Sequence, residues 1–232
     1  MTTDIPKPRL LIVEDDTNLS IVIKDYLSLS GFDVIVCENG KTGWEAFQSS
    51  PFDLCILDVM MPERDGFALA EMIRQQNAEV PILFLTAKSA KEDKIKGFKL
   101  GADDYILKPF NIEELVLRIE VFLKRSQNHV HAKEVFMLGL YTFDYLNLRL
   151  TGNNKQQKLT QREADVLKLL CQNIGKVTKR EDILTQLWGE DDYFLGRSLD
   201  VFISKLRRYL KHDPGVTIVN YHSVGFQLNV NQ

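Results

Sequence analysis

Carboxylates, a hydroxyl and a lysine stand at the ends of apolar runs in the first half of the chain. Glu14 and Asp15 follow one run, Asp58 ends another, Thr86 ends a third, and Lys108 follows a fourth. Carboxylates that lie close together raise each other's pKa unless a cation neutralises them. Such oxygen ligands suit Mg²⁺, which commonly accompanies a phosphoryl group. With a lysine for the phosphoryl oxygens, this set could let a carboxylate accept a phosphoryl group.

These side chains can meet only if the apolar runs are neighbouring strands. Up to about residue 125, short apolar runs alternate with segments of helical periodicity, which predicts a parallel sheet covered by helices on both faces. The expected strands are 9–15, 32–38, 52–58, 80–87 and 104–108, and the expected helices are 17–31, 40–50, 65–77, 91–101 and 111–125. The carboxyl ends of parallel strands share one edge, where functional groups collect.

The pattern changes after Arg125. Residues 126–134 are polar and predict a linker between a first domain, 1–125, and a second domain, 135–232. Apolar residues then alternate over 135–160, which predicts antiparallel strands. Three helical segments (160–173, 179–189 and 197–212) and a hairpin (216–230) follow. This order is typical of a winged helix-turn-helix module.

The charge differs between the two halves. Residues 1–125 hold 21 acidic and 15 basic residues, a net of −6, whereas residues 126–232 hold 11 and 14, a net of +3. This asymmetry suggests two domains with different partners. No apolar run approaches the roughly 20 residues of a membrane span, and the N-terminus lacks a signal-peptide core, so we expect a cytoplasmic protein without a membrane partner. The three widely spaced cysteines are expected to be small core residues.

The third helical segment of the second domain is basic on its polar side. Its apolar face consists of Leu199, Phe202, Ile203, Leu206 and Leu210. The remaining positions carry one acid, Asp200, near the start of the segment. This pattern fits a recognition helix, whose basic side chains contact phosphates while Val201 or Ser204 meets base edges.

The motifs LIVEDD, CILDVMMPERDG, FLTA and DDYILKPF together resemble the receiver domain of bacterial two-component response regulators over about residues 8–125. The resemblance implies an α/β fold of the (βα)5 flavodoxin-like type, and it implies Asp58 as the phospho-acceptor. It also implies Mg²⁺ bound by Glu14, Asp15, Asp58 and the backbone carbonyl of Met60. Members often have Asp-Asp where Glu14-Asp15 stand, and Glu-Asp is a frequent variant.

The same resemblance implies roles for residues around the phosphoryl group. Thr86 is the switch hydroxyl, Lys108 contacts the phosphoryl group, and Tyr105 matches an aromatic side chain that moves inward when the hydroxyl moves. Pro109 is expected to follow a cis peptide bond. The chain would then be a switch rather than an enzyme, catalysing only its own phosphotransfer and slow dephosphorylation.

The stretches LTQREADVLKLL, GKVTKREDILTQLWG, RSLDVFISKLRRYL and VGFQL resemble the α+β winged-helix DNA-binding domain of the OmpR/PhoB family over roughly residues 135–230. By position, the implied DNA-facing residues are Arg197, Ser198, Val201, Ser204, Lys205, Arg207 and Arg208. Most members carry an arginine at the hairpin tip, where this chain has His222, and a neutral histidine binds a narrow minor groove less well. The wing is also similar to that of the RprY-like subset.

Two further expectations concern the loop before the third helix. Trp188 is expected to lie in this loop, as a structural residue or a contact for polymerase, and residues 190–196 are expected to continue it.

The resemblance also implies partners. A sensor histidine kinase would donate the phosphoryl group, and phosphorylation would favour a homodimer that binds double-stranded promoter DNA and works with RNA polymerase. The expected dimer surface lies on the segments 91–101, 104–108 and 111–125. Its residues are Lys91, Lys94, Ile95, Phe98, Asp103, Asp104, Glu114, Val116 and Arg118.

Three other functions are alternatives to a phosphorylation-dependent regulator. A phosphatase with a nucleophilic Asp58 would need a second acid two residues later, where this chain has Met60. A flavin-binding domain would need small polar residues after the first strand, where the sequence EDDTN would repel a phosphate. A regulator that binds DNA constitutively, without phosphorylation, remains an alternative. Met60 and Lys88 offer no carboxamide to orient an attacking water, so we expect a phosphorylated state that is not especially short-lived.

Overall fold

The computed structural model describes residues 6–61, 65–87, 91–127, 134–188 and 193–231, with the backbone alone for 91–95, 124–127 and 193–197. The chain divides into two compact units, Met1–Val130 and His131–Gln232. This division falls inside the segment predicted as a linker. The last helix of the first unit runs to Gln127, two residues past the predicted end of the first domain.

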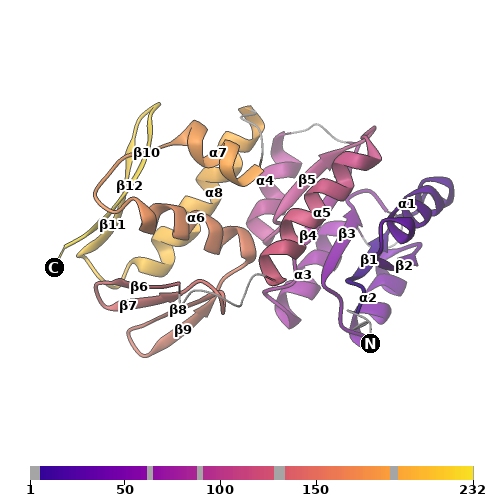
Figure 1. The fold of residues 1–232 in the computed structure, drawn as a ribbon, viewed down its shortest axis with the longest axis horizontal. Helices are drawn as coiled ribbons and strands as arrows, with labels where there is room; N and C mark the ends of the chain where they lie inside the picture. The colour runs from indigo at the N-terminus through magenta and orange to yellow at the C-terminus, as the bar shows by residue number, and fades with distance from the viewer. Residues whose placement is uncertain (1–5, 62–64, 88–90, 128–133, 189–192, 232) are drawn as a thin grey trace, which may run out of the picture. The chain divides into compact units, whose positions relative to one another are not determined.

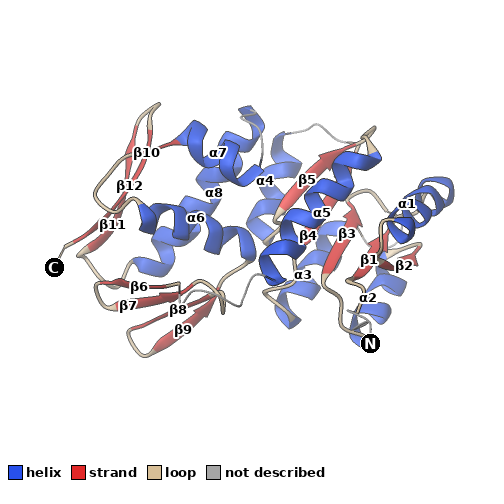
Figure 2. Ribbon diagram, viewed as in Figure 1, coloured by secondary structure: helices blue, strands red, loops and turns tan. Residues whose placement is uncertain are grey.

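The first unit is a parallel sheet with helices on both faces (Figures 1 and 2). Its strands are β1 (Arg9–Val13), β2 (Asp33–Cys37), β3 (Leu54–Asp58), β4 (Ile82–Thr86) and β5 (Asp104–Leu107). Its helices are α1 (Thr17–Leu29), α2 (Gly40–Ser49), α3 (Gly66–Gln76), α4 (Lys91–Leu100) and α5 (Ile112–Gln127). The strand order β2-β1-β3-β4-β5 confirms the predicted flavodoxin-like fold.

Short-range sequence signals start the helices of this unit. The side chains of Asp16, Asn39 and Asp65 accept backbone N–H bonds at the starts of α1, α2 and α3. Two of the inner strands, β3 and β4, are buried at every residue. The side chains of α1 and α5 pack with the strands into one core cluster, which includes Ile23 and Leu115. Buried strands next to capped helices are what a doubly wound sheet requires.

The second unit contains two antiparallel sheets and three helices among its described residues (Figure 2). One sheet has the order β6-β7-β8-β9, formed by Val135–Leu138, Tyr141–Asp144, Arg149–Gly152 and Lys155–Lys158. The helices are α6 (Gln161–Gln172), α7 (Arg180–Trp188) and α8 (Tyr193–Leu210). The other sheet has the order β10-β12-β11, formed by Thr178–Lys179, Gly225–Val230 and Val216–Tyr221. This arrangement confirms the predicted winged-helix fold.

Two local expectations for the second unit are wrong. Helix α8 begins at Tyr193, so residues 193–196 are helical rather than part of a loop, whereas residues 190–192 lie outside the described residues. Trp188 is the last residue of α7, where it is buried against Phe202, with the Arg162 guanidinium 4.4 Å from its ring centroid. Its role in this fold is therefore packing.

The three cysteines are core residues, as expected. Cys37, Cys55 and Cys171 are all buried free thiols, and burial raises the pKa of Cys55 and of Cys171 to about 12. Within the described part of the chain, none of the helices is both long enough and apolar enough to cross a bilayer.

Candidate functional site

Strand register brings the predicted acidic and basic residues to one edge of the first sheet. Asp58 pairs in register with Leu85, next to Thr86, and Thr86 pairs with Leu107, next to Lys108. Glu14 follows β1, which lies beside β3. Glu14, Asp15 and Asp58 each offer a carboxylate oxygen, and these three oxygens lie within 4.8 Å of one another.

Lys108 joins two of the three carboxylates. Its Nζ donates to Glu14 Oε1 at 2.8 Å and Oε2 at 2.6 Å, and to Asp58 Oδ2 at 2.7 Å. Glu14 and Asp58 are buried, with exposed fractions of 1% and 5%, whereas Asp15 is exposed. The ammonium group is therefore already positioned where oxygens bound to Asp58 would carry negative charge.

The protonation equilibria of this pocket reflect burial and charge. Burial raises the pKa of Glu14, because it disfavours the ionised carboxylate more than the Lys108 contacts favour it. Burial alone would lower the pKa of Lys108, but its hydrogen bonds to Asp58 and Glu14, together with their negative charges, outweigh it and raise the pKa. Lys108 therefore stays charged at neutral pH.

The loop after β3 folds back onto Asp58. The Met60 backbone N–H donates to Asp58 Oδ1 at 2.9 Å, while half of the Met60 side chain is exposed. Gly66 begins α3 so close to this strand that a Cβ atom there would lie 2.0 Å from the Asp58 carbonyl oxygen. The glycine of the DG pair thus permits α3 to begin directly against the end of β3.

The donor set fits a hard divalent cation. Three carboxylates within reach of one another supply the oxygen ligands that Mg²⁺ prefers. The neighbouring Asp16 has a different task, because its Oδ1 accepts the N–H groups of Asn18 and Leu19 at the start of α1. Among the described residues, Glu14, Asp15 and Asp58 therefore form the carboxylate set available to a metal in this pocket.

Thr86 and Tyr105 lie on the adjacent strands β4 and β5. Thr86 ends β4 and is buried, with 1% of its surface exposed. The Tyr105 ring is buried between Phe84 and Phe98, at ring-centroid distances of 5.1 Å and 4.9 Å. The aromatic ring thus lies inside the domain in this structure. The peptide bond between Lys108 and Pro109 is cis, as expected.

Several residues expected on a dimer surface are instead engaged within the first unit. Phe98 is buried against Tyr105, and Val116 packs against the core cluster. The Asp103 carboxylate accepts from the Ile82 N–H at 3.0 Å and from Arg74 at 2.7 Å. Phe98, Asp103 and Asp104 are each at most 2% exposed, so the expectation that they lie on an exposed surface is wrong. The side chains of Lys91, Lys94 and Ile95 lie outside the described residues.

The other predicted dimer residues form one ion network. Arg118 contacts Asp104 at 3.0 Å and Glu114 at 2.8 Å, which ties α5 to β5. On the same two elements, Leu107 of β5 and Leu117 and Val121 of α5 are exposed apolar residues that the sequence did not single out. Leu117 and Val121 stand four residues apart on α5, a spacing that could have identified them as one face.

Helix α8 carries the predicted DNA-facing residues. Its predicted apolar face, which includes Leu199, Phe202 and Leu206, is buried. Ser204, Arg207 and Arg208 are exposed and Val201 is half-buried, whereas Ser198 is buried rather than facing solvent. Arg207 Nε also donates to the Ile218 carbonyl of β11 at 2.9 Å. The Arg197 side chain lies outside the described residues.

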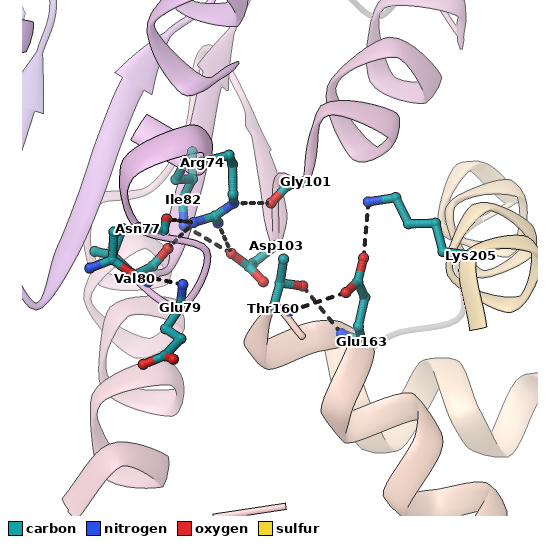
Figure 3. A network of polar contacts seen from close by, with 10 residues as sticks. All are labelled: Arg74, Asn77, Glu79, Val80, Ile82, Gly101, Asp103, Thr160, Glu163 and Lys205. Atoms are coloured by element: carbon teal, nitrogen blue, oxygen red, sulfur yellow. Dashed lines mark hydrogen bonds and ion pairs between the residues drawn. The ribbon is translucent and has the colours of Figure 1, made fainter. Parts of the chain in front are cut away.

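Lys205 is held inside its own domain. Its Nζ lies 3.1 Å from Glu163 Oε1, and only 13% of the lysine side chain is exposed (Figure 3). Glu163 also forms a capping box with Thr160 at the start of α6, in which each side chain accepts a backbone N–H from the other residue. The charge of Lys205 is thus largely used to fix α8 against α6, a role that the sequence analysis missed.

Asp200 and His222 are two further polar residues of this domain. Asp200, in the middle of α8, is paired with Arg180 at 2.5 Å, so its charge is compensated locally. His222 is exposed in the turn between β11 and β12. Its position is the tip of the wing, as predicted from the sequence.

A flavodoxin-like domain with an acidic pocket at its carboxyl edge, joined to a winged-helix domain, defines a response regulator with a transcription-regulatory output. Residues 10–120 match the family described as response regulator receiver domain, and residues 154–228 match the family described as transcriptional regulatory protein, C terminal. Whole-length relatives support the same assignment. The chain belongs to the OmpR/PhoB-type response regulators.

Two of these relatives match most of the chain. The chain is 45% identical over 223 residues to the transcriptional regulatory protein RprY of Bacteroides fragilis, covering 96% of this chain and 94% of that protein. It is 39% identical over 202 residues to the response regulator ArlR of Staphylococcus epidermidis, covering 87% and 90%.

Solved structures resemble the whole chain or its first domain. DrrB of Thermotoga maritima, an OmpR/PhoB homolog, is 29% identical with a TM-score of 0.51, covering 97% of this chain and 100% of that one. The receiver domain of the Francisella response regulator 1452 is 36% identical with a TM-score of 0.50, covering 52% and 99%.

Proposed function

We propose that the protein is a phosphorylation-dependent transcription regulator whose phospho-acceptor is Asp58. The observation that carries this proposal is the contact of one lysine, Lys108, with both Asp58 and Glu14 at the carboxyl edge of the sheet. In the proposed reaction an Asp58 carboxylate oxygen attacks the phosphorus of a phosphohistidine on a sensor kinase. The new O–P bond forms as the N–P bond breaks, and the imidazole nitrogen leaves with its electron pair.

The residues of the pocket divide this task. Lys108 balances charge on the transferred oxygens, and Glu14, Asp15, Asp58 and the Met60 carbonyl would hold Mg²⁺. Bound there, Mg²⁺ supplies positive charge that offsets the charge developing on the phosphoryl oxygens. Thr86, at the end of β4, is the hydroxyl that would bind the new phosphoryl group. The protein is then a switch that catalyses only its own phosphotransfer and slow dephosphorylation.

The output domain would bind double-stranded promoter DNA through α8 and the wing. Arg208 and Ser204 are exposed on α8, and His222 is exposed at the wing tip. Phosphorylation would favour a homodimer through the α4-β5-α5 face, where the exposed apolar residues Leu117 and Val121 lie. Two linked DNA domains raise each other's effective concentration at paired half-sites. RNA polymerase is the expected downstream partner, and these partners would place the protein in the cytoplasm.

A direct experiment compares wild type with the Asp58→Ala variant. Promoter-DNA binding and dimerisation would be measured with and without beryllofluoride and Mg²⁺, which together mimic the phosphorylated aspartate. We expect both properties to increase in wild type and to stay at the basal level in the variant. Equal DNA binding under all four conditions would instead favour the alternative, a regulator that binds DNA constitutively.

Two of the basic residues of α8, Arg208 and Lys205, should behave differently when replaced by alanine. Arg208→Ala should reduce the slope of log binding constant against log salt concentration by about 1, because one phosphate contact is lost. Lys205→Ala should leave that slope unchanged. It should instead lower the free energy of unfolding by about 1–3 kcal/mol, because the buried Glu163 carboxylate loses the ammonium group that compensates its charge.

Fluorescence anisotropy with labelled duplex DNA over a series of salt concentrations, and urea unfolding of the same proteins, give both readouts. A shallower salt dependence for Lys205→Ala would show that this lysine leaves Glu163 and reaches the DNA backbone.

A further inference from the structure

The inward position of Tyr105 depends on a missing side chain in α4. Gly97 lies in the interior of this helix, and a Cβ atom built on it would lie 1.5 Å from the Tyr105 hydroxyl oxygen and 2.6 Å from the ring carbon that carries it. The same Cβ would lie 3.0 Å from a Phe67 ring carbon. No side chain larger than hydrogen fits at position 97 while the tyrosine ring stays where it is.

The Tyr105 ring has little room to move. Phe84 lies on one side at a ring-centroid distance of 5.1 Å, and Phe98 lies on another at 4.9 Å. Phe67 packs edge-on against Phe84 at 5.2 Å. A ring packed against Phe84 and Phe98 cannot shift by the distance that a methyl group at position 97 requires, so it must leave this site.

We infer that Gly97 is a positioning residue, which admits the Tyr105 ring to the interior and so couples the phosphorylated pocket to the α4-β5-α5 surface. This inference rests on the proposed function. Tyr105 is on the strand next to Thr86, and Gly97 is on the helix whose face the ring reaches. The residue at position 97 therefore sets the balance between an inward and an outward ring.

Helix propensity does not explain why position 97 is glycine. Glycine inside a helix is unfavourable compared with alanine, because it loses more backbone entropy on folding. Its φ angle is not among the positive values that require glycine elsewhere in the chain. The space needed by the Tyr105 hydroxyl is the feature of the structure that accounts for it. If Gly97 served only the helix backbone, Gly97→Ala would leave the response to phosphorylation intact.

The test is Gly97→Ala in the full-length chain, with Lys99→Ala as the matched control. Lys99 is on the same helix with an exposed side chain. Beryllofluoride with Mg²⁺ should still bind at Asp58 in both variants, as seen by fluorine NMR. The resulting gain in promoter affinity should be at least about tenfold smaller in Gly97→Ala than in wild type, because the activated state loses its inward ring. Lys99→Ala should respond as wild type does.

A second readout follows the ring directly. In protein with carbon-13-labelled tyrosine, the Tyr105 ring signal is identified by its loss in Tyr105→Leu. In activated wild type it should carry the upfield shift expected beside Phe84 and Phe98, and this shift should be absent in Gly97→Ala. An unchanged ring signal, or an unchanged gain in promoter affinity, overturns the inference.

The double variant separates the contact from general damage to the fold. Once Tyr105→Leu has removed the ring, adding Gly97→Ala should cause no further loss of promoter affinity, and it should restore folding if Gly97→Ala alone fails to fold. If the double variant also fails to fold, position 97 is needed for another reason and the inference is wrong. If wild type binds beryllofluoride without any gain in promoter affinity, the proposed function fails and the inference fails with it.

Discussion

Replacing Lys108 by methionine is expected to slow phosphorylation of Asp58 by acetyl phosphate about a hundredfold, while it tightens the binding of Mg²⁺ to the same pocket. The rate should fall because Nζ, 2.7 Å from Asp58 Oδ2, is the fixed cation that would meet the incoming phosphoryl oxygens. Methionine keeps a similar length and volume without the charge. Phosphorylation rates by radiolabel incorporation, and Mg²⁺ binding by isothermal titration calorimetry, would measure the two effects.

The opposite signs of these two effects identify what the lysine does. Lys108 neutralises Glu14 and Asp58, so it competes with any metal for the same negative charge. Without it, the buried carboxylates are left uncompensated and attract Mg²⁺ more strongly. Lys41→Met, at an exposed position of α2, is the matched control and should change neither quantity. A slower reaction with weaker Mg²⁺ binding would mean that the pocket had collapsed, and the assignment of Lys108 to the phosphoryl group would then lack support.

The fold and the acidic pocket could be predicted because both depend on local patterns with one geometric consequence. Alternating apolar runs and helical segments imply a parallel sheet, and a parallel sheet collects its strand ends at one edge. Glu14, Asp58, Thr86 and Lys108 each stand at such an end. Their meeting therefore needs only strand order and register, which the structure supplies. No long-range pairing of individual side chains had to be known.

Side-chain pairing between distant elements could not be predicted in the same way. The basic pattern of α8 does not reveal that Lys205 is paired with Glu163, which lies on another helix 42 positions earlier. Phe98 and Asp103 looked like surface residues because they stand in a densely charged segment. In the fold, Phe98 packs on Tyr105, and Asp103 binds Arg74. Charge content describes a segment, whereas burial depends on which neighbours the tertiary structure brings.

The pairing of Arg74 with Asp103 leads to the largest expected effect on stability. Arg74→Ala should lower the free energy of unfolding of the receiver domain by about 3 kcal/mol, because it leaves a buried carboxylate without its cation. The Arg74 guanidinium donates to the Gly101 carbonyl at 2.9 Å, to the Val80 carbonyl and to Asp103 Oδ2 at 2.7 Å (Figure 3). One side chain at the end of α3 thus binds the end of α4 and the segments that begin β4 and β5.

Arg9→Ala, in the same domain, is the matched control for losing an arginine. Its partner is the half-exposed Asp33 at 3.2 Å, so a loss below about 1 kcal/mol is expected. Urea unfolding followed by Trp44 fluorescence in a Trp188→Phe background reports on the receiver domain alone.

The buried charge itself can be separated from the lost carbonyl bonds. Asp103→Asn keeps a side-chain oxygen for the Ile82 N–H, which Asp103 Oδ2 accepts at 3.0 Å, but it removes the negative charge. If the uncompensated charge causes most of the loss, the double variant with Arg74→Ala should be more stable than Arg74→Ala alone. If it is no more stable, the cost arises from the Gly101 and Val80 carbonyls that lose their donor. The role of Arg74 would then be to hold backbone segments together rather than to balance Asp103.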